Sequence, residues 1–152
     1  FYTHKPESQI LSGLVGSEMC IRDSYINSVI NIAKKNMFVE TLTKRRRLIP
    51  EINSNVFQLR NSSERMAINM PIQGTAADVI KIAMININKE VIQQKMLSKM
   101  IIQVHDELIF EVPKEEIFLM ESMLRETMSN ALKLKVPLIV DISYADNWGD
   151  LK

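Results

Sequence analysis

The sequence predicts an α+β fold, in which helices cover one face of an antiparallel sheet. Residues 100–112 have the pattern of a strand, a turn and a second strand, and Pro113 closes the second strand. The elements follow the order helix, hairpin, helix and strand. The helix before the hairpin is indicated by an apolar stripe about four turns long. The stripe comprises Ala76, Val79, Ile80, Ala83, Met84 and Ile87.

The first half of the chain predicts two helices separated by short extended segments. Apolar residues from 26 to 33 fall at helical spacing, which predicts a helix from about residue 25. The segment "FVETL" favours a short strand, "TKRR" a turn, and "RLIPEI" an extended run that stops at proline. A second helix is expected to begin near Ser62 or Ser63, because small polar residues cap helix starts. Pro71 is expected to kink or restart this helix.

The second half predicts a helix and a last strand after the hairpin. Apolar residues at helical spacing indicate a third helix from about Lys114 to Leu132. The segment "VPLIVDISY", residues 136–144, favours a last strand. In the polar tail that follows, Trp148 is expected to be a packing anchor.

Composition fits one soluble domain or part of a larger one. The chain has 152 residues, of which 46% are hydrophobic and 24% are charged, and its net charge is +1. It lacks an apolar run long enough for a transmembrane helix. The single cysteine, Cys20, allows no intramolecular disulfide, which fits a reducing cytoplasm.

Four consecutive cations, Lys44 to Arg47, allow two interpretations. They form either a solvated surface turn or a zone of contact with phosphates. The overall charge does not decide between them.

Three long polar side chains share one predicted helix face. Arg65, Asn69 and Gln73 lie four residues apart, and each such step advances about 40° around a helix. They form either a plain solvated face or a row of hydrogen-bond donors. Such a row could contact the acceptors that every base pair presents in the DNA minor groove, whatever the sequence.

The hairpin carries three ionisable residues, His105, Asp106 and Glu107, at its tip. Both flanking runs are predicted to be buried strands, and burying a carboxylate is costly. A divalent cation would offset this cost, because Asp106 and Glu107 offer the hard oxygen ligands that Mg²⁺ binds. The alternative is an exposed tip with ordinary solvated charges.

Four segments together resemble family A DNA polymerases, the bacterial DNA polymerase I type. "ERMAINMPIQGTAADVIKIAM" and "IIQVHDELIFEV" resemble the C-terminal part of the polymerase domain. "FVETLTKRRRLIPEIN" and "VPLIVDISYADNW" match upstream and terminal segments in the same order. The resemblance extends from about Tyr25 to Lys152. It implies a palm subdomain whose antiparallel sheet carries an active-site hairpin and is backed by helices, as a fragment of a larger polymerase domain.

The resemblance implies a role for each residue of the two motifs. Asp106 matches the catalytic metal-binding aspartate, and Glu107 matches an acidic neighbour that supports the metal site. His105 matches a residue near the primer 3′ end. The remaining positions match residues that contact the primer–template duplex, largely along its minor groove: Arg65, Asn69 and Gln73.

The implied activity is DNA-templated nucleotidyl transfer to a primer 3′-hydroxyl by two Mg²⁺ ions. Positioning and charge dominate such chemistry. The implied partners are primer–template DNA and deoxynucleoside triphosphates. The implied protein is a monomer of the bacterial cytoplasm, associated with the nucleoid and with no membrane partner.

The chain departs from the family pattern at several points. The second metal-binding aspartate of the family lies in an upstream segment resembling D-Y-S-Q-I-E. This chain has "PESQI", where Glu7 is one residue off and its neighbours do not match, so Glu7 is not assigned. The fingers helix and exonuclease segments are not found either, so an incomplete fragment, inactive alone, is expected. Lys44 stands where the family commonly has glycine, and a lysine resists positive φ, so a change of turn shape is expected.

Residues 1–24 lie outside the resemblance. "LSGLVGSEMCIRDS" is similar to translated sequencing-adapter read-through, so one interpretation is that residues 1–24 are artefactual. Residues 25–152 are expected to form a partial polymerase domain that covers the fingers/palm junction and the palm.

Two other functions are alternatives. The chain could be a duplex nucleic-acid-binding remnant without catalysis, if no upstream aspartate is supplied. It could also be a metal-dependent phosphohydrolase that uses Asp106 and Glu107. The row of Arg65, Asn69 and Gln73 argues against the second alternative, because small substrates need no such row.

Overall fold

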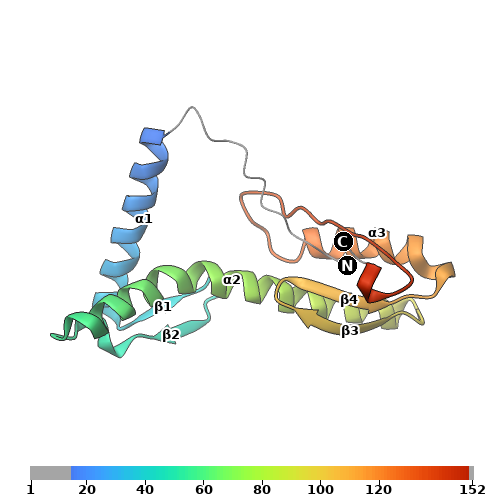
Figure 1. Cartoon of the computed structure of the whole chain (residues 1–152), viewed down its shortest axis with the longest axis horizontal. Coiled ribbons are helices and arrows are strands. Elements are labelled where there is room, and N and C mark those ends of the chain that lie inside the picture. Colours follow the sequence, from blue (N-terminus) through green and yellow to red (C-terminus); the bar gives the residue numbers. More distant parts are fainter. Residues whose placement is uncertain (1–14, 151–152) are drawn as a thin grey trace. The chain divides into compact units, whose positions relative to one another are not determined.

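The computed structural model describes the backbone of residues 15–150 and the side chains of residues 22–150. The chain divides into two compact units between Ala76 and Ala77, called here the N-terminal unit and the C-terminal unit (Figure 1). Both consist of helices and a two-stranded antiparallel sheet, so the predicted α+β class is confirmed. No helix in the described part of the chain is long and apolar enough to cross a membrane.

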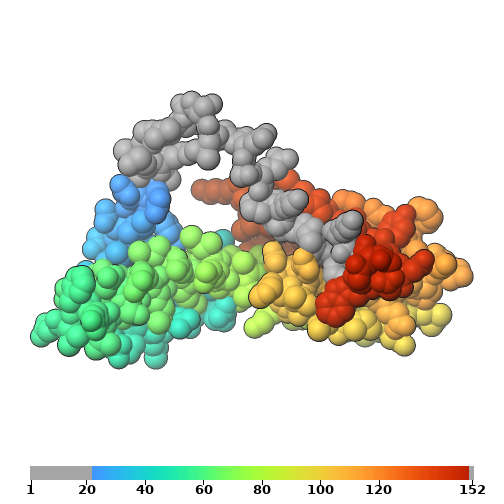
Figure 2. All heavy atoms as spheres, viewed as in Figure 1, coloured from blue at the N-terminus to red at the C-terminus, as the bar shows by residue number. Residues whose placement is uncertain are grey.

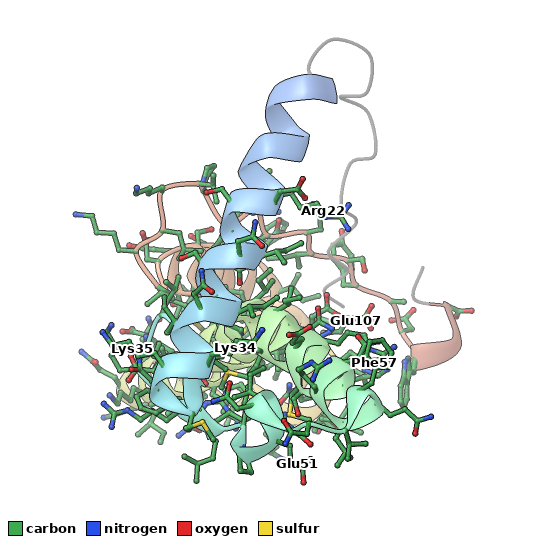
Figure 3. All side chains as sticks on the ribbon, turned by 90° about the vertical axis from the view of Figure 1, so that its left-hand side faces the viewer. Arg22, Lys34, Lys35, Glu51, Phe57 and Glu107 are labelled. Atoms are coloured by element: carbon green, nitrogen blue, oxygen red, sulfur yellow. The ribbon has the colours of Figure 1, made fainter. Side chains whose placement is uncertain are left out.

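The N-terminal unit has a small core beneath a short hairpin. Helix α1 ends where Met37 adopts a left-handed conformation (φ 62) and its N–H donates to the Ala33 carbonyl at 2.8 Å. The last turn of α1 carries Lys34 and Lys35 (Figure 3), whose charges suit the negative end of the helix dipole. The elements are α1 (Val15–Asn36), β1 (Phe38–Glu40), β2 (Arg46–Leu48), a 3-10 helix (Pro50–Asn53) and the first part of α2 (Phe57–Gln93). The core consists of Ala33, Val39, Ile49, Ile52, Ala67 and Met70.

Residues Thr41–Arg45, called the β1–β2 turn, connect the two strands of this unit. The backbone N–H of Arg45 donates to Thr41 Oγ1 at 3.1 Å, and the Thr41 N–H donates to the Arg45 carbonyl at 3.0 Å. Lys44 has φ 68, a conformation that glycine adopts without strain. Lys44 therefore adopts the left-handed conformation in the turn, although a residue with a side chain disfavours it.

Replacing Lys44 with glycine is expected to raise the free energy of unfolding by about 0.5 kcal/mol. A left-handed non-glycine residue costs about 1–2 kcal/mol, and the greater freedom of glycine in the unfolded chain offsets part of the gain. Urea unfolding at equilibrium measures the change. Lys44→Ala removes the same exposed Lys44–Glu40 ion pair but keeps Cβ, so it should gain nothing. A lower midpoint for Lys44→Gly than for Lys44→Ala would contradict the prediction.

The C-terminal unit packs a hairpin against two helices. Helix α2 ends in a Schellman motif, in which Lys95 has φ 55 and Met96 N–H donates to the Val91 carbonyl at 3.0 Å. The elements are the second part of α2, β3 (Lys99–Val104), β4 (Glu107–Glu111), a 3-10 helix (Lys114–Glu116), α3 (Ile117–Ser129) and a 3-10 helix (Trp148–Asp150). The core consists of Ala83, Ile87, Leu108, Met120, Met123, Leu124, Met128, Ala131 and Val140.

The segment after α3 lies against the helices and hairpin of the same unit (Figure 2). Val140 is 4% exposed, and its carbonyl accepts a hydrogen bond from Arg125 Nη1 at 2.8 Å. The predicted strand over residues 136–144 is wrong, because these residues form no strand. A strand needs a neighbouring strand to pair with, and the described residues offer none to this segment. Trp148, expected to be a packing anchor, is 59% exposed.

Helix α2 differs from the prediction in both its start and its continuity. It begins at Phe57, not near Ser62 or Ser63. The hydroxyl of Ser54 accepts the N–H of Val56 at 3.2 Å just before the first turn, so this earlier serine orders the helix start. The helix also continues through Pro71 without a restart.

Hydrogen bonds to Glu116 connect the residues just before β3 to the segment before α3. Its carboxylate accepts the N–H groups of Leu97 and Ser98 at 2.8 and 2.9 Å and the Ser98 hydroxyl at 2.5 Å. The hydrogen bond from the Leu97 backbone is the largest cause that holds the pKa of Glu116 below its ordinary value. Nothing in the sequence pattern distinguishes Glu116 from its neighbour Glu115.

Glu116→Gln is expected to lower the stability at neutral pH and to flatten its decline in acid. Because the folded-state pKa is depressed, the stabilisation is fully present above the unfolded-state pKa of about 4.3. It is lost as pH falls through the folded-state pKa. Urea midpoints measured from neutral pH into acid test this, with the exposed Glu115→Gln as the control. Parallel pH profiles for the wild type and Glu116→Gln would contradict it.

Candidate nucleic-acid interface and acidic hairpin

One face of α2 in the N-terminal unit presents a row of long polar side chains. Arg65, Asn69 and Gln73 are all exposed and lie on an unbroken helix, so their spacing of four residues places them on one face. Ala67, nearly opposite Asn69 at 100° per residue, and Met70, on the side between them, are buried in the core of this unit. The core thus fixes which face of α2 is exposed. That face offers one guanidinium and two amide groups as donors.

The acidic hairpin of the C-terminal unit has a turn of only two residues. Val104 pairs with Glu107, which leaves His105 and Asp106 outside the ladder. His105 has φ 54, and positive φ at the first central position is typical of type II′ hairpin turns, where glycine is favoured. Gln103 Nε2 donates to the His105 carbonyl at 2.9 Å. The turn therefore holds an exposed imidazole at a strained position that costs about 1 kcal/mol or more.

The two carboxylates at this tip differ in exposure. Asp106 is exposed, and Glu107 is half-buried as the first residue of β4. Mg²⁺ is commonly held by one or two protein carboxylates together with substrate phosphates and water. The pair fits a site of this kind. In the described residues, no three His, Cys, Asp or Glu side chains gather into a fuller metal cage.

The strands beside the tip are less buried than predicted. Ile101 and Ile102 are 58% and 42% exposed, whereas Leu108 is 1% exposed. The pairing register shifts between Met100 and Ile102, so Ile101 is a bulge residue. Helices cover the face that carries Leu108. The prediction that the acids are buried is therefore wrong for Asp106, which is exposed. The metal hypothesis thus depends on the carboxylate oxygens that Asp106 and Glu107 offer, and no longer on the cost of burying them.

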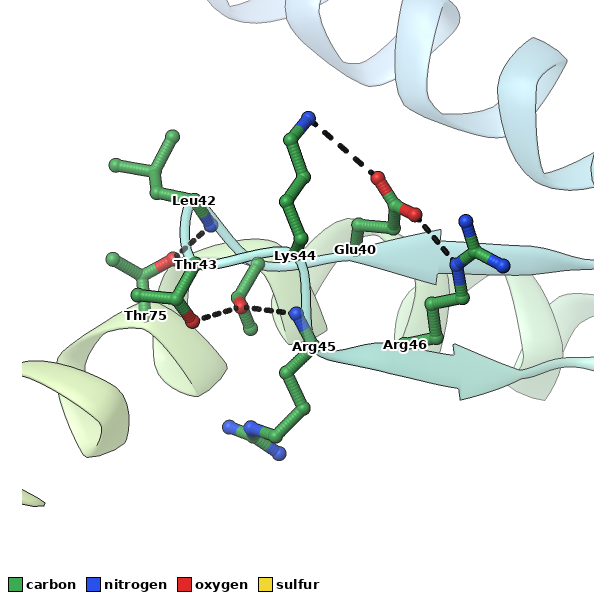
Figure 4. Close-up of polar contacts among 8 residues, drawn as sticks. Glu40, Leu42, Thr43, Lys44, Arg45, Arg46 and Thr75 are labelled. Atoms are coloured by element: carbon green, nitrogen blue, oxygen red, sulfur yellow. Dashed lines mark hydrogen bonds and ion pairs between the residues drawn. The ribbon is translucent and has the colours of Figure 1, made fainter.

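The cations of the β1–β2 hairpin have mostly intramolecular partners. Arg46 Nε donates to Glu40 Oε1 at 2.7 Å, and its guanidinium lies 4.6 Å from the centroid of the Phe38 ring. Lys44 Nζ lies 3.7 Å from Glu40 Oε2 (Figure 4). The hydrogen bond from Arg46 is the largest cause that holds the pKa of Glu40 below its ordinary value.

The other two arginines of this run differ from each other. Arg45 Nη2 donates to the Gly74 carbonyl at 2.9 Å, so Arg45 packs against α2. The side chain of Arg47 is exposed and makes no ion pair or hydrogen bond within the residues that the structure describes. Of the four cations, Arg47 is thus the one most available to an external phosphate.

The structure gathers the predicted residues into two groups, each within its own unit. Arg65, Asn69 and Gln73 share the α2 face, and His105, Asp106 and Glu107 share the hairpin tip. Sequence reasoning missed a third feature, the contact of the β1–β2 turn with Gly74 and Thr75. An isolated glycine inside a helical pattern was the available signal, because it costs about 1 kcal/mol relative to alanine and so suggests a packing reason.

The sequence of this chain matches a known protein family over most of its length. The family described as DNA polymerase family A matches residues 20–150. The chain belongs to this family. The predicted resemblance to family A DNA polymerases is thus confirmed.

Bacterial members of family A share close to half of the residues. DNA polymerase I of Streptococcus pneumoniae serotype 4 (strain ATCC BAA-334 / TIGR4) is 46% identical over 129 residues, which is 85% of this chain and 15% of that protein. DNA polymerase I of Bacillus subtilis (strain 168) is also 46% identical over 129 residues, with the same shares. The chain thus spans about 15% of the length of these relatives.

A solved family A structure has a similar fold. It is the POL domain of Pol1 from M. smegmatis in complex with DNA primer-template and dNTP. The TM-score is 0.81 at 43% identity, and the match covers 83% of this chain and 22% of that one. Sequence and fold therefore place the chain in the same family.

Proposed function

We propose that this chain is the duplex-holding and metal-binding part of a DNA-templated DNA polymerase. It works within a complete family A enzyme, which transfers a nucleotide from a deoxynucleoside triphosphate to a primer 3′-hydroxyl. The observation that carries this proposal is the exposed row of Arg65, Asn69 and Gln73 on an unbroken helix. An enzyme that copies any sequence needs contacts of this kind, and a sequence-specific binding protein does not.

The row on α2 contacts the minor groove of the primer–template duplex. Every base pair presents acceptors there at purine N3 and pyrimidine O2, and the guanidinium of Arg65 and the amide NH2 groups of Asn69 and Gln73 can donate to them. A correctly paired duplex keeps the acceptors in register with the row. The Arg47 side chain, exposed and without an intramolecular partner in the described residues, adds a phosphate contact.

The hairpin tip supplies the protein side of the metal site. Asp106 and Glu107 would hold Mg²⁺, and bound Mg²⁺ supplies positive charge that favours deprotonation of the primer hydroxyl and offsets the charge of the pyrophosphate. Asp106 is exposed and can reach a ligand directly. Glu107 is anchored in β4 and supports the site from a fixed position. His105 contacts the primer 3′ end from the turn.

The solved relative bound to primer-template and dNTP supports both molecules as ligands of this chain within its complete enzyme. The complete enzyme is proposed to be a monomer that acts on nucleoid DNA in the bacterial cytoplasm, with roles in replication and repair. A further metal-binding carboxylate comes from the part of the polymerase domain upstream of residue 25.

A chimeric enzyme tests the proposal. Residues 25–150 replace the matching segment of Bacillus subtilis DNA polymerase I, which is 46% identical over the aligned residues. The chimera is expected to extend a primer on a template with Mg²⁺. A folded chimera that binds the duplex but does not extend it would favour a duplex-binding remnant without catalysis.

The isolated 152-residue chain is expected to bind duplex DNA but not to extend a primer. Two adjacent carboxylates cannot by themselves hold two metal ions and a triphosphate in line, and no further acidic residue joins them within the described residues. Gel-based primer extension compares the purified chain with its Asp106→Ala variant. Extension above the level of that variant would contradict the prediction.

A further inference from the structure

Helix α2 has a weak point at Pro71, between the second and the last residue of its polar row. Pro71 lacks an N–H, so it cannot donate to the Ala67 carbonyl, and its ring crowds that carbonyl. Helices commonly kink at such a position. Gln73 follows Pro71 by two residues, whereas Asn69 precedes it. The direction of Gln73 relative to Asn69 therefore depends on what holds the helix together across the proline.

The β1–β2 turn contacts α2 at and just after this weak point, while Val39 of the adjoining strand β1 lies in the same core as Ala67 and Met70 before it. Leu42 N–H donates to Thr75 Oγ1 at 3.0 Å (Figure 4). The same hydroxyl donates to the Pro71 carbonyl at 2.5 Å, one helical turn back. Arg45 Nη2 donates to the Gly74 carbonyl at 2.9 Å. A hydroxyl can donate once and accept twice, so Thr75 links the turn and the proline through a single buried group.

Gly74 sets how closely the turn approaches the helix. A Cβ at this position would lie 2.6 Å from Thr41 Cγ2 and 3.3 Å from Arg45 Nη2. Contacts below about 3 Å between carbon atoms are strongly repulsive. Only glycine therefore lets the turn lie against α2 at this distance. Gly74 and Thr75 face the turn, while Gln73 lies on the exposed face next to them.

We propose that the β1–β2 turn is a splint that holds α2 across Pro71, and that Thr75 is a positioning residue for Gln73. The splint sets the register between Gln73 and Asn69, and thereby the match of the polar row to successive base pairs. Thr75 does not touch the nucleic acid itself. The part of this inference that concerns DNA rests on the proposed function, whereas the splint stands on the contacts alone.

Duplex affinity of the complete 152-residue chain tests the positioning role. Fluorescence anisotropy with a labelled primer–template duplex compares Thr75→Val, Thr75→Ser, Gln73→Ala and the double variant Gln73→Ala/Thr75→Val. Thr75→Val should weaken binding about fivefold, close to the effect of Gln73→Ala. In both variants the hydrogen bond between Gln73 and the duplex is lost, by misplacement in the first and by removal in the second. Thr75→Ser keeps the hydroxyl and should restore affinity. The double variant should bind like Gln73→Ala alone.

Ser98→Ala is the matched control, because it also removes a buried, hydrogen-bonded hydroxyl but lies in the C-terminal unit. It should leave duplex affinity unchanged. Additive losses in the double variant, or an equal loss in Ser98→Ala, would overturn the positioning role.

Hydrogen exchange tests the splint without DNA. Thr75→Val should speed exchange of the backbone amides of residues 72–76 at least fivefold, but not those near Ala83. Unchanged exchange would overturn the splint. If exchange rises while Gln73→Ala leaves duplex affinity unchanged, the splint stands and the proposed duplex contact of Gln73 is wrong.

Gly74→Ala gives an independent test, because the direction of its effect on the thermal midpoint distinguishes a close contact from an exposed helix position. In an exposed helix this substitution raises stability, because alanine favours helix. Here the added Cβ displaces the turn, so the thermal midpoint should fall, and the amides of residues 72–76 should exchange faster. A rise in the midpoint would overturn the close contact on which the splint depends.

Discussion

In the chimeric polymerase that carries residues 25–150, Asp106→Ala is expected to lower kcat for primer extension about 10³-fold or more. The exposed carboxylate at the hairpin tip is the leading candidate ligand for Mg²⁺ in this chain. A metal ion stabilises the charge of the transition state by several kcal/mol, and about 4 kcal/mol corresponds to a factor of about 10³. Steady-state extension of a labelled primer at saturating nucleotide measures kcat.

Glu111→Ala is the matched control for this experiment. Glu111 is also an exposed carboxylate of the hairpin, but it ends β4 at the far end from the tip. It should retain activity close to that of the chimera. The Asp106→Ala chimera should also keep its duplex affinity, which shows that it has folded. A loss of less than tenfold would rule out Asp106 as the principal metal ligand.

Replacing Arg65, Asn69 and Gln73 together by alanine is expected to weaken duplex binding by the isolated chain about 100-fold. Each side chain contributes one net hydrogen bond of about 1 kcal/mol, and the three contacts add to about 3 kcal/mol. The loss should be nearly equal for duplexes rich in A·T and rich in G·C, because the contacted acceptors are common to all base pairs. Anisotropy titrations at fixed salt measure both.

The same helix provides a control for Gln73. Gln93 is also exposed but lies twenty residues further along α2, on roughly the opposite face at about 100° per residue. Gln93→Ala should bind the duplex as the wild type does, whereas Gln73→Ala should bind about fivefold more weakly. A marked change in sequence preference after the triple substitution would contradict a role in checking base-pair shape.

The local features that follow from periodicity could be predicted from the sequence. The spacing of Arg65, Asn69 and Gln73 predicts one shared face as long as the helix is continuous. The hairpin at residues 100–112 follows from two apolar runs around a polar tip. The acidic pair at that tip was located correctly, although its metal-binding role stays a prediction.

The features that depend on tertiary surroundings could not be predicted. The apolar composition of β3 indicated burial, but Ile101 and Ile102 remain exposed because helices cover only the other face of the hairpin. Residues 136–144 have strand composition but form no ladder. Ser62 and Ser63 have the chemistry of a helix cap, yet the helix had already begun at Phe57. In each case the residues suit two environments, and contacts from distant segments decide which of the two environments they occupy.

The two-residue turn at the hairpin tip has a consequence for how this segment tolerates changes in length. Between the bulge at Ile101 and the tip, every residue of β3 has a fixed partner on β4. Inserting or deleting one residue there would move each following side chain to the opposite face of the sheet. Such a change would turn Leu108 towards solvent and shift both carboxylates. A substitution changes one side chain here, whereas a codon gained or lost changes the facing of every residue that follows it in the strand.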